Sequence, residues 1–242
     1  MSFVKHIPNC ITTLNLVFGI VGVVFAFEGK TSLAFHMMLA ALLFDFCDGF
    51  AARALKSYSP MGKELDSLCD MVSFGVLPSV MMYDIARAYV WTSAGYMAFL
   101  PLVFSVGAAL RLAKFNVDER QHSSFRGLAA PAAAVAAASL CCYADAEPNS
   151  LIGGLCTFRW FLPAVSVLLV ALMLCDLPMF SFKVSKDDSR GLKMNRIFFV
   201  ADCAVILAGV LILGEHWTLA VMLMVLLYVV KNLVFALGAH KK

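Results

Sequence analysis

The sequence predicts an all-α integral membrane protein, a polytopic bundle of about eight transmembrane helices that forms a single domain over residues 1–242. Of the 242 residues, 62% are hydrophobic and 14% are charged, whereas about a quarter of a soluble domain is charged. The mean hydropathy is +0.85. Apolar segments also recur at the length of about 20 residues that a helix needs to cross a bilayer.

Eight apolar segments are expected to form the spans. They cover residues 7–27, 32–54, 62–84, 91–112, 127–144, 159–178, 197–213 and 216–238. The first is too long for the apolar part of a signal peptide, so we expect it to be a transmembrane helix. The fifth and seventh are short and weakly bounded, which leaves six or seven spans open. Ser59 and Pro60 should separate the second span from the third.

The positive charges indicate how the segments are oriented. With eight spans, sixteen of the nineteen Lys and Arg residues fall on the side of the N-terminus, and only Lys30, Arg87 and Arg159 fall on the other. Because cytoplasmic loops are rich in Lys and Arg, we expect both termini in the cytoplasm. Basic loops facing anionic lipid account for the net charge of +3, so no nucleic-acid partner is expected.

The eight cysteines lie mostly inside the expected spans and form no C-x-x-C pair. We therefore interpret them as small apolar packing residues rather than as a disulfide or metal framework.

Four carboxylates interrupt the apolar pattern in the stretch DFCDGFAARALKSYSPMGKELDSLCD, residues 45–70. Asp45 and Asp48 share one face of the second span, and Asp66 and Asp70 share one face of the third, because helical residues three and four apart are neighbours. The short loop makes the two helices antiparallel neighbours. The four side chains should therefore converge, roughly 10 Å inside the cytoplasmic boundary.

These acids require compensation. Each charge in a span costs about 2.5–3.5 kcal/mol, and like charges in one cavity repel one another. Ligands that are all oxygen suit Mg²⁺, Mn²⁺ or Ca²⁺ better than zinc. The alternative is a structural network that shares protons or contains salt bridges.

Small residues beside the acids leave room for a ligand. Gly49 and Ala52 on the second span and Gly62 on the third let a bulky group approach the backbone, and the guanidinium of Arg53 matches a phosphate. We interpret this arrangement as a slot for a nucleotide diphosphate bridged to metal. Helix packing is the alternative reason for small residues in a membrane helix.

The pattern Asp45-x2-Asp48-Gly49-x2-Ala52-Arg53-x8-Gly62-x3-Asp66-x3-Asp70 resembles the signature of the CDP-alcohol phosphatidyltransferase family. The family transfers a phosphatidyl group from CDP-diacylglycerol to an alcohol and releases CMP. The resemblance implies that Asp45, Asp48 and Asp66 hold divalent metal, Mg²⁺ or Mn²⁺, against the diphosphate. Asp70 would complete the metal site and act as the general base. The remaining signature residues, Gly49, Ala52, Arg53 and Gly62, would bind CDP-diacylglycerol. The resemblance further implies a homodimer in a bacterial cytoplasmic (inner) membrane, with the active site facing the cytoplasm.

Two flanking stretches resemble the family members that use L-serine as the acceptor. One is D-S-L-C-D-M-V-S-F-G-V-L-P, residues 66–78; the other is R-L-A-K-F-N, residues 111–116, followed by F-R-G-L-A-A-P, residues 125–131. The resemblance implies that serine is bound by Ser73, Arg111, Asn116 and Arg126. Lys114 stands where the family usually has Arg, and Lys lacks the planar fork that binds a carboxylate with two hydrogen bonds.

The sequence leaves several alternatives open. The alternative acceptors are choline, glycerol phosphate and inositol phosphate, and transfer is either direct or through a covalent intermediate. A metal-ion or proton transporter would use the same carboxylates as a relay, although transport sites usually lie near the bilayer midplane at broken helices. Asn9 and Thr12 either touch the diphosphate or cap the first helix. Asp202 lies within the seventh segment without a partner that the sequence identifies.

Overall fold

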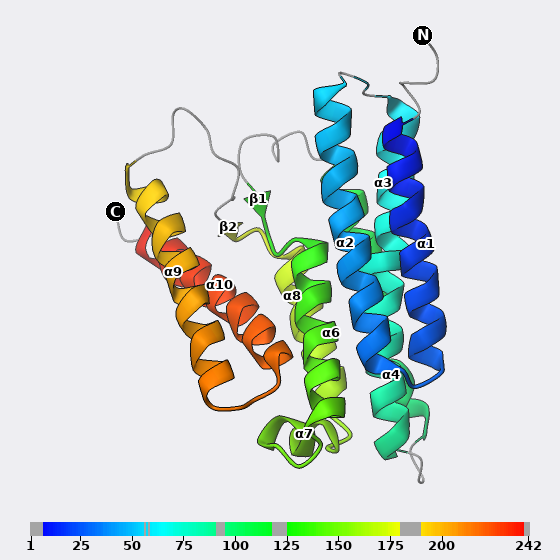
Figure 1. Cartoon of the computed structure of the whole chain (residues 1–242), viewed down its shortest axis with the longest axis vertical. Helices are drawn as coiled ribbons and strands as arrows, with labels where there is room; N and C mark the ends of the chain where they lie inside the picture. Colours follow the sequence, from blue (N-terminus) through cyan, green and yellow to red (C-terminus); the bar gives the residue numbers. More distant parts are fainter. Residues whose placement is uncertain are drawn as a thin grey trace.

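The computed structural model describes residues 7–55, 57, 59–90, 95–117, 125–179 and 190–239. Within these residues the protein is a helical bundle (Figure 1). The helices are α1 (Ile7–Phe27), α2 (Thr31–Ala54), α3 (Pro60–Asp70), the π-helix η2 (Met71–Val76), α4 (Leu77–Val90), the 3₁₀-helix η3 (Gly95–Leu102), α5 (Val103–Val117), α6 (Ala130–Ala146), α7 (Leu151–Cys156), α8 (Phe161–Leu174), α9 (Arg190–Ile212) and α10 (Trp217–Ala239). Two-residue strands, β1 (Phe125–Arg126) and β2 (Pro178–Met179), pair antiparallel.

In the part of the chain that the structure describes, five helical runs are long and apolar enough to cross a membrane. They are Ile7–Phe27, Thr31–Ala54, Pro60–Ala88, Gly95–Val117 and Trp217–Val234. Shorter apolar helices, Ala130–Ala146, Phe161–Leu174 and Phe198–Ile212, occupy the other three expected segments. The all-helical membrane bundle is therefore confirmed, and the number of eight spans stays a prediction.

Several predicted boundaries differ from the structure. The start of the segment 91–112 lies partly outside the described residues, and the described helix continues to Val117. The segment 159–178 is wrong at its C-terminal end, because α8 stops at Leu174 and Pro178 belongs to β2. The segment 127–144 is predicted to begin at residue 127, but helix α6 begins three residues later, at Ala130. Gly127 has a φ of 73°, a left-handed conformation that a helix does not accommodate.

The connections between the helices lie alternately at the two ends of the bundle (Figure 1). The start of α1, the α2–α3 connection, and strands β1 and β2 lie toward one end, and α7 and the α9–α10 turn lie toward the other. Helices α1–α4 stand together on one side, α6 and α8 lie in the middle, and α9 and α10 form a tilted hairpin on the far side. Helix α9 packs on α10, and α10 packs on α6.

Helix α6 is the centre of the bundle. Its alanines Ala133, Ala134, Ala137 and Ala138 are fully buried, and it contacts α2, α4, α8 and α10. Small side chains allow this close approach of helix backbones.

The third span is one continuous helical run that contains a π-helical segment directly after Asp70. A π-turn disturbs the regular backbone hydrogen bonds. The hydroxyl oxygens of Ser79 and Ser105 lie 2.8 and 3.2 Å from the Gly75 carbonyl oxygen and supply partners for it. At the start of the run, the Ser59 hydroxyl accepts from the Gly62 N–H at 2.9 Å, and Pro60 occupies the first turn, as expected.

Candidate active site

Three of the four predicted acids converge where α2 and α3 face each other. Asp45, Asp48 and Asp66 each offer a carboxylate oxygen, and these oxygens all lie within 4.8 Å of one another. Among the described residues, Asp48 Oδ2 and Asp66 Oδ1 are buried and have no hydrogen-bond partner. Buried oxygens are normally satisfied, so an all-oxygen set with two unsatisfied members fits a hard divalent cation.

Asp70 lies one helical turn beyond Asp66 and has a different environment. It is 8% exposed, and its Oδ1 accepts a hydrogen bond from Asn15 Nδ2 of α1 at 3.1 Å. Asp70 is not part of the close group that the other three acids form. Sequence reasoning missed Asn15; the available signal was a carboxamide in the middle of an apolar span, where polar residues are rare and costly.

A cavity of about 190 Å³ opens beside Asp48 and Asp66. Its other lining residues are Pro8, Asn9, Thr12, Gly49, Ala52, Ser57, Ser59, Gly62 and Lys63. Three of the four residues predicted to bind CDP-diacylglycerol, namely Gly49, Ala52 and Gly62, thus line one cavity.

The two glycines that line the cavity have different surroundings. A Cβ at Gly62 would lie 3.0 Å from Asn9 Oδ1 and from Ser59 Oγ, which is tighter than ordinary contact. A Cβ at Gly49 would lie 3.8 Å from Nη1 of Arg53, so the guanidinium of the fourth predicted residue covers this glycine. The small residues therefore leave space in front of an arginine and two carboxylates.

Two predicted acceptor residues, Arg111 and Arg126, lie near the strands. Arg111 is 3% exposed, and its Nε donates to the Leu128 carbonyl at 3.2 Å. Arg126 is half-buried in β1. The backbone beside it is fixed on the end of α8, because the Leu128 N–H donates to the Leu172 carbonyl at 2.8 Å.

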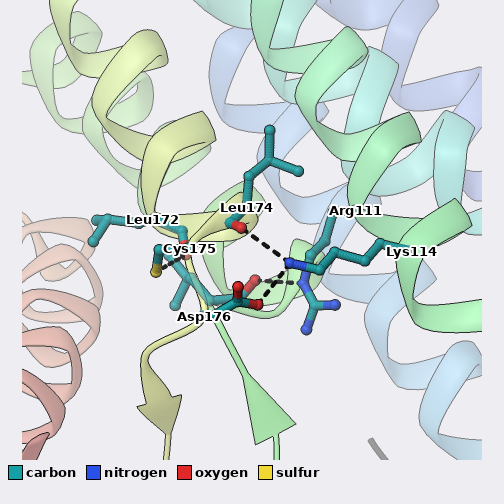
Figure 2. A network of polar contacts seen from close by, with 7 residues as sticks. Arg111, Lys114, Leu172, Leu174, Cys175 and Asp176 are labelled. Atoms are coloured by element: carbon teal, nitrogen blue, oxygen red, sulfur yellow. Dashed lines mark hydrogen bonds and ion pairs between the residues drawn. The ribbon is translucent and has the colours of Figure 1, made fainter. Parts of the chain in front are cut away.

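Lys114, the departure from the family pattern, has an internal carboxylate partner. Figure 2 shows its ammonium between the Leu174 carbonyl and Asp176, close to Arg111 on the same helix. The distances from Lys114 Nζ are 3.2 Å to Leu174 O and 2.8 Å to Asp176 Oδ1. Lys114 therefore fastens α5 to the end of α8.

The other two predicted acceptor residues contact neighbouring helices. Asn116 Nδ2 donates to Ser67 Oγ at 2.8 Å, and the Asn116 carbonyl accepts from Lys63 Nζ at 3.1 Å. Ser73 is fully buried, and its hydroxyl donates to the Asn15 backbone carbonyl at 3.1 Å. Asn116 thus contacts α3 and Ser73 contacts α1.

The sequence profile of the CDP-alcohol phosphatidyltransferase family matches residues 5–177. The chain belongs to the CDP-alcohol phosphatidyltransferase family. The matched region contains all four acids and ends before the α9–α10 hairpin.

Curated relatives of this chain are named for serine transfer. The chain is 37% identical over 134 residues to CDP-diacylglycerol--serine O-phosphatidyltransferase of Bacillus subtilis, covering 52% of this chain and 70% of that protein. It is 33% identical over 182 residues to the protein of that name in Helicobacter pylori, covering 74% and 73%. An archaetidylserine synthase of Methanothermobacter thermautotrophicus is 35% identical over 142 residues, covering 57% and 58%. The chain spans less than half the length of the mycobacterial relatives that it also matches.

Proposed function

We propose that the protein transfers the phosphatidyl group of CDP-diacylglycerol to the hydroxyl of L-serine, giving phosphatidylserine and CMP. The observation that carries this proposal is the convergence of Asp45, Asp48 and Asp66 beside a cavity lined by Gly49, Ala52 and Gly62. A diphosphate needs positive charge from a metal and space against the backbone. The three acids supply ligands for the metal, and the small residues leave space for the diphosphate.

The three converging acids would hold Mg²⁺ or Mn²⁺, with Asp70 in reach of the same region. Metal bound there would neutralise charge on the diphosphate and make CMP a better leaving group. Arg53, whose guanidinium lies over Gly49, would bind a phosphate through two parallel hydrogen bonds.

Asp70 is the proposed general base. Its carboxylate accepts the proton of the serine hydroxyl as the hydroxyl oxygen attacks the phosphorus of the phosphatidyl group. A new O–P bond forms, the bond from that phosphorus to the oxygen of CMP breaks, and CMP leaves with the electron pair. We propose direct attack, because it requires no nucleophile from the protein.

Serine is the proposed acceptor on the strength of the relatives. The Bacillus, Helicobacter and archaeal proteins all carry serine in their names, although the archaeal lipid differs. Arg111 and Arg126 offer cations that could pair with the serine carboxylate. Ser73 and Asn116 would shape this region through the helices that they contact.

We further propose a homodimer in a bacterial cytoplasmic membrane, with both termini and the active site facing the cytoplasm. The distribution of Lys and Arg supports this orientation. The start of α1 and the α2–α3 connection lie toward the same end of the bundle (Figure 1), which is the end that holds the cavity.

The test is CMP release by the purified protein in detergent with CDP-diacylglycerol and Mg²⁺ or Mn²⁺. Serine, choline, glycerol 3-phosphate and inositol phosphate are offered separately, with Asp66→Ala as the control. We expect release with serine only, and none from the variant. Release with a different alcohol would keep the chemistry and overturn the acceptor. No release with any alcohol from folded protein would favour metal-ion or proton transport.

A further inference from the structure

Asn15 connects a helix that carries no acid to the proposed base. Its Nδ2 lies 3.1 Å from Asp70 Oδ1, and the two residues are 55 positions apart in the sequence. The Asn15 side chain is fully buried, whereas Asp70 is 8% exposed. The amide nitrogen is a donor and the carboxylate oxygen is an acceptor, so this orientation of the Asn15 side chain forms a hydrogen bond.

A second hydrogen bond, from Ser73, also fixes the position of Asn15. The Ser73 hydroxyl donates to the Asn15 backbone carbonyl at 3.1 Å. A Cβ at Gly19, one turn further along α1, would lie 3.1 Å from Ser73 Cα. Glycine at this position therefore lets α1 approach the π-helical segment closely enough for both hydrogen bonds.

Packing alone does not account for an asparagine at position 15, because the residue destabilises the fold where it is buried. Among the described residues, its Oδ1 is buried without a hydrogen-bond partner, and an unsatisfied buried oxygen destabilises a fold. Asn232 of α10 shows the ordinary pattern, since its Nδ2 donates to the Tyr228 carbonyl of its own helix at 2.7 Å. Asn15 instead directs its amide to a carboxylate on a different helix.

We infer that Asn15 is a positioning residue that orients the Asp70 carboxylate for proton transfer from the acceptor alcohol. One carboxylate oxygen is occupied by the Asn15 amide, which fixes the rotation of the group and leaves the other oxygen for the hydroxyl. This inference rests on the proposed function. It adds a residue of α1 to a site whose acids come from α2 and α3.

The experiment compares turnover and binding in the full-length protein. Asn15→Leu keeps the approximate size and removes the amide, and Asn232→Leu makes the same change remote from the acids. We expect Asn15→Leu to lower kcat by roughly 10- to 100-fold, by analogy with the loss found when a residue that orients a metal ligand is replaced. The KM for CDP-diacylglycerol and its dependence on Mg²⁺ should stay within about twofold, and Asn232→Leu should keep wild-type kcat.

The Asp70→Asn background distinguishes a purely structural role of Asn15 from a role that acts through Asp70. If Asn15 acts through Asp70, then Asn15→Leu should have little further effect on the residual turnover of Asp70→Asn, because residues that act as a unit are non-additive. A full further loss in that background would overturn the inference. So would wild-type kcat in Asn15→Leu, or an equal loss of CDP-diacylglycerol binding and turnover.

The remaining outcomes are an Asn15→Leu variant that does not fold and a wild-type protein that uses another acceptor or none. If Asn15→Leu does not yield folded protein, Asn15→Ser is measured instead; its hydroxyl is too short to reach Asp70, so wild-type kcat in that variant would contradict the inference. Turnover by the unmodified protein tests the proposed function separately. An acceptor other than serine leaves the variant comparison valid on that alcohol, whereas absence of all turnover rejects the proposed function and this inference with it.

Discussion

At the scale of single residues, Asp70 differs from the other three acids in its contacts. Asp45, Asp48 and Asp66 form the close oxygen group, while Asp70 bonds to Asn15. Asp70→Asn should therefore lower turnover by roughly 10²- to 10⁴-fold, the usual contribution of a general base, and keep CDP-diacylglycerol binding within a few-fold. Binding is measured by calorimetry in detergent beside the CMP assay.

Asp66→Asn is the comparison for this prediction, because it removes a member of the oxygen group and should weaken binding and turnover together. Equal losses of binding and turnover in Asp70→Asn would instead assign Asp70 to the metal ligands.

Arg53 provides a second residue-scale prediction. Arg53→Lys keeps the charge and loses the planar fork, so the KM for CDP-diacylglycerol should rise by roughly 10- to 100-fold, the value of a hydrogen bond to a charged group. The KM for serine should stay unchanged. Arg87→Lys is the matched control, since Arg87 pairs with Asp84 on its own helix at 3.1 Å and lies near the end of α4, far along the third span from the acids. An unchanged KM in Arg53→Lys would remove Arg53 from the diphosphate site.

The sequence predicted that the acids converge, which holds for three of the four, but it did not predict the residues that form hydrogen bonds with the predicted site residues. Helical spacing alone places Asp45 and Asp48, or Asp66 and Asp70, on one face, and the structure brings three of these acids together. The bonds from Asn15 to Asp70 and from Asn116 to Ser67 join residues that are 55 and 49 positions apart. No local period encodes such pairs, so they require the three-dimensional arrangement.

At the scale of elements, the turn before α6 depends on one glycine. Gly127 has a φ of 73°, and a Cβ there would lie 2.6 Å from the carbonyl oxygens of Cys175 and Met173. Gly127→Ala should lower the midpoint of thermal unfolding, because it adds a steric clash to the roughly 1–2 kcal/mol cost of a left-handed residue. Scans at one fixed rate in detergent would measure the midpoint.

Gly214→Ala is the matched variant for this comparison. Gly214 has the same φ of 73°, yet a Cβ there would meet nothing within 4 Å in the described part of the chain. It should show the conformational cost alone. Equal shifts in the two variants would mean that the close approach of the carbonyls at the end of α8 to Gly127 adds no cost to the alanine substitution.

The hairpin of α9 and α10 supplies a partner for Asp202 that the sequence did not identify. Asp202 has a partner, because Lys231 of α10 donates to its Oδ2, and the Lys231 ammonium also lies 5.8 Å from the centre of the Phe199 ring. Lys231→Leu should therefore destabilise the protein, since it leaves a carboxylate unpaired inside an apolar helix.

The double variant Asp202→Leu with Lys231→Leu tests whether the pair acts as a unit. It should regain most of the unfolding midpoint lost in Lys231→Leu, because removing both charges leaves none uncompensated. A double variant that is less stable than the single one would show that Asp202 has a separate structural role.

Hydropathy predicted the elements that face lipid better than those that face protein. Helices α1 and α10 agree with their predicted segments within one residue. The signal for α6 is weak because its alanines are buried by other helices and need little hydrophobic side chain. The short helix α7 begins at a Ser150 cap that accepts from the Gly153 N–H, and β1 pairs with β2 far along the chain; hydropathy reports neither interaction.

At the scale of the whole molecule, the number of spans depends on the three short apolar helices. Helices α6, α8 and α9 must each cross the bilayer if both termini are to lie on the cytoplasmic side with eight spans. The α6–α7 connection and the α9–α10 turn lie toward the end of the bundle opposite the α2–α3 connection (Figure 1). The arrangement of the helices therefore agrees with alternating crossings.

Labelling of single cysteines tests this topology. In a background without native cysteines, Glu147→Cys and Leu213→Cys should react with a membrane-impermeant maleimide on intact cells. Met61→Cys, which is 71% exposed near the α2–α3 connection, should react only after permeabilisation. If α8 or α9 does not cross, Leu213→Cys becomes protected while Glu147→Cys still reacts. If α6 does not cross, Glu147→Cys itself is protected, so the two labels distinguish a failure of α6 from a failure of α8 or α9.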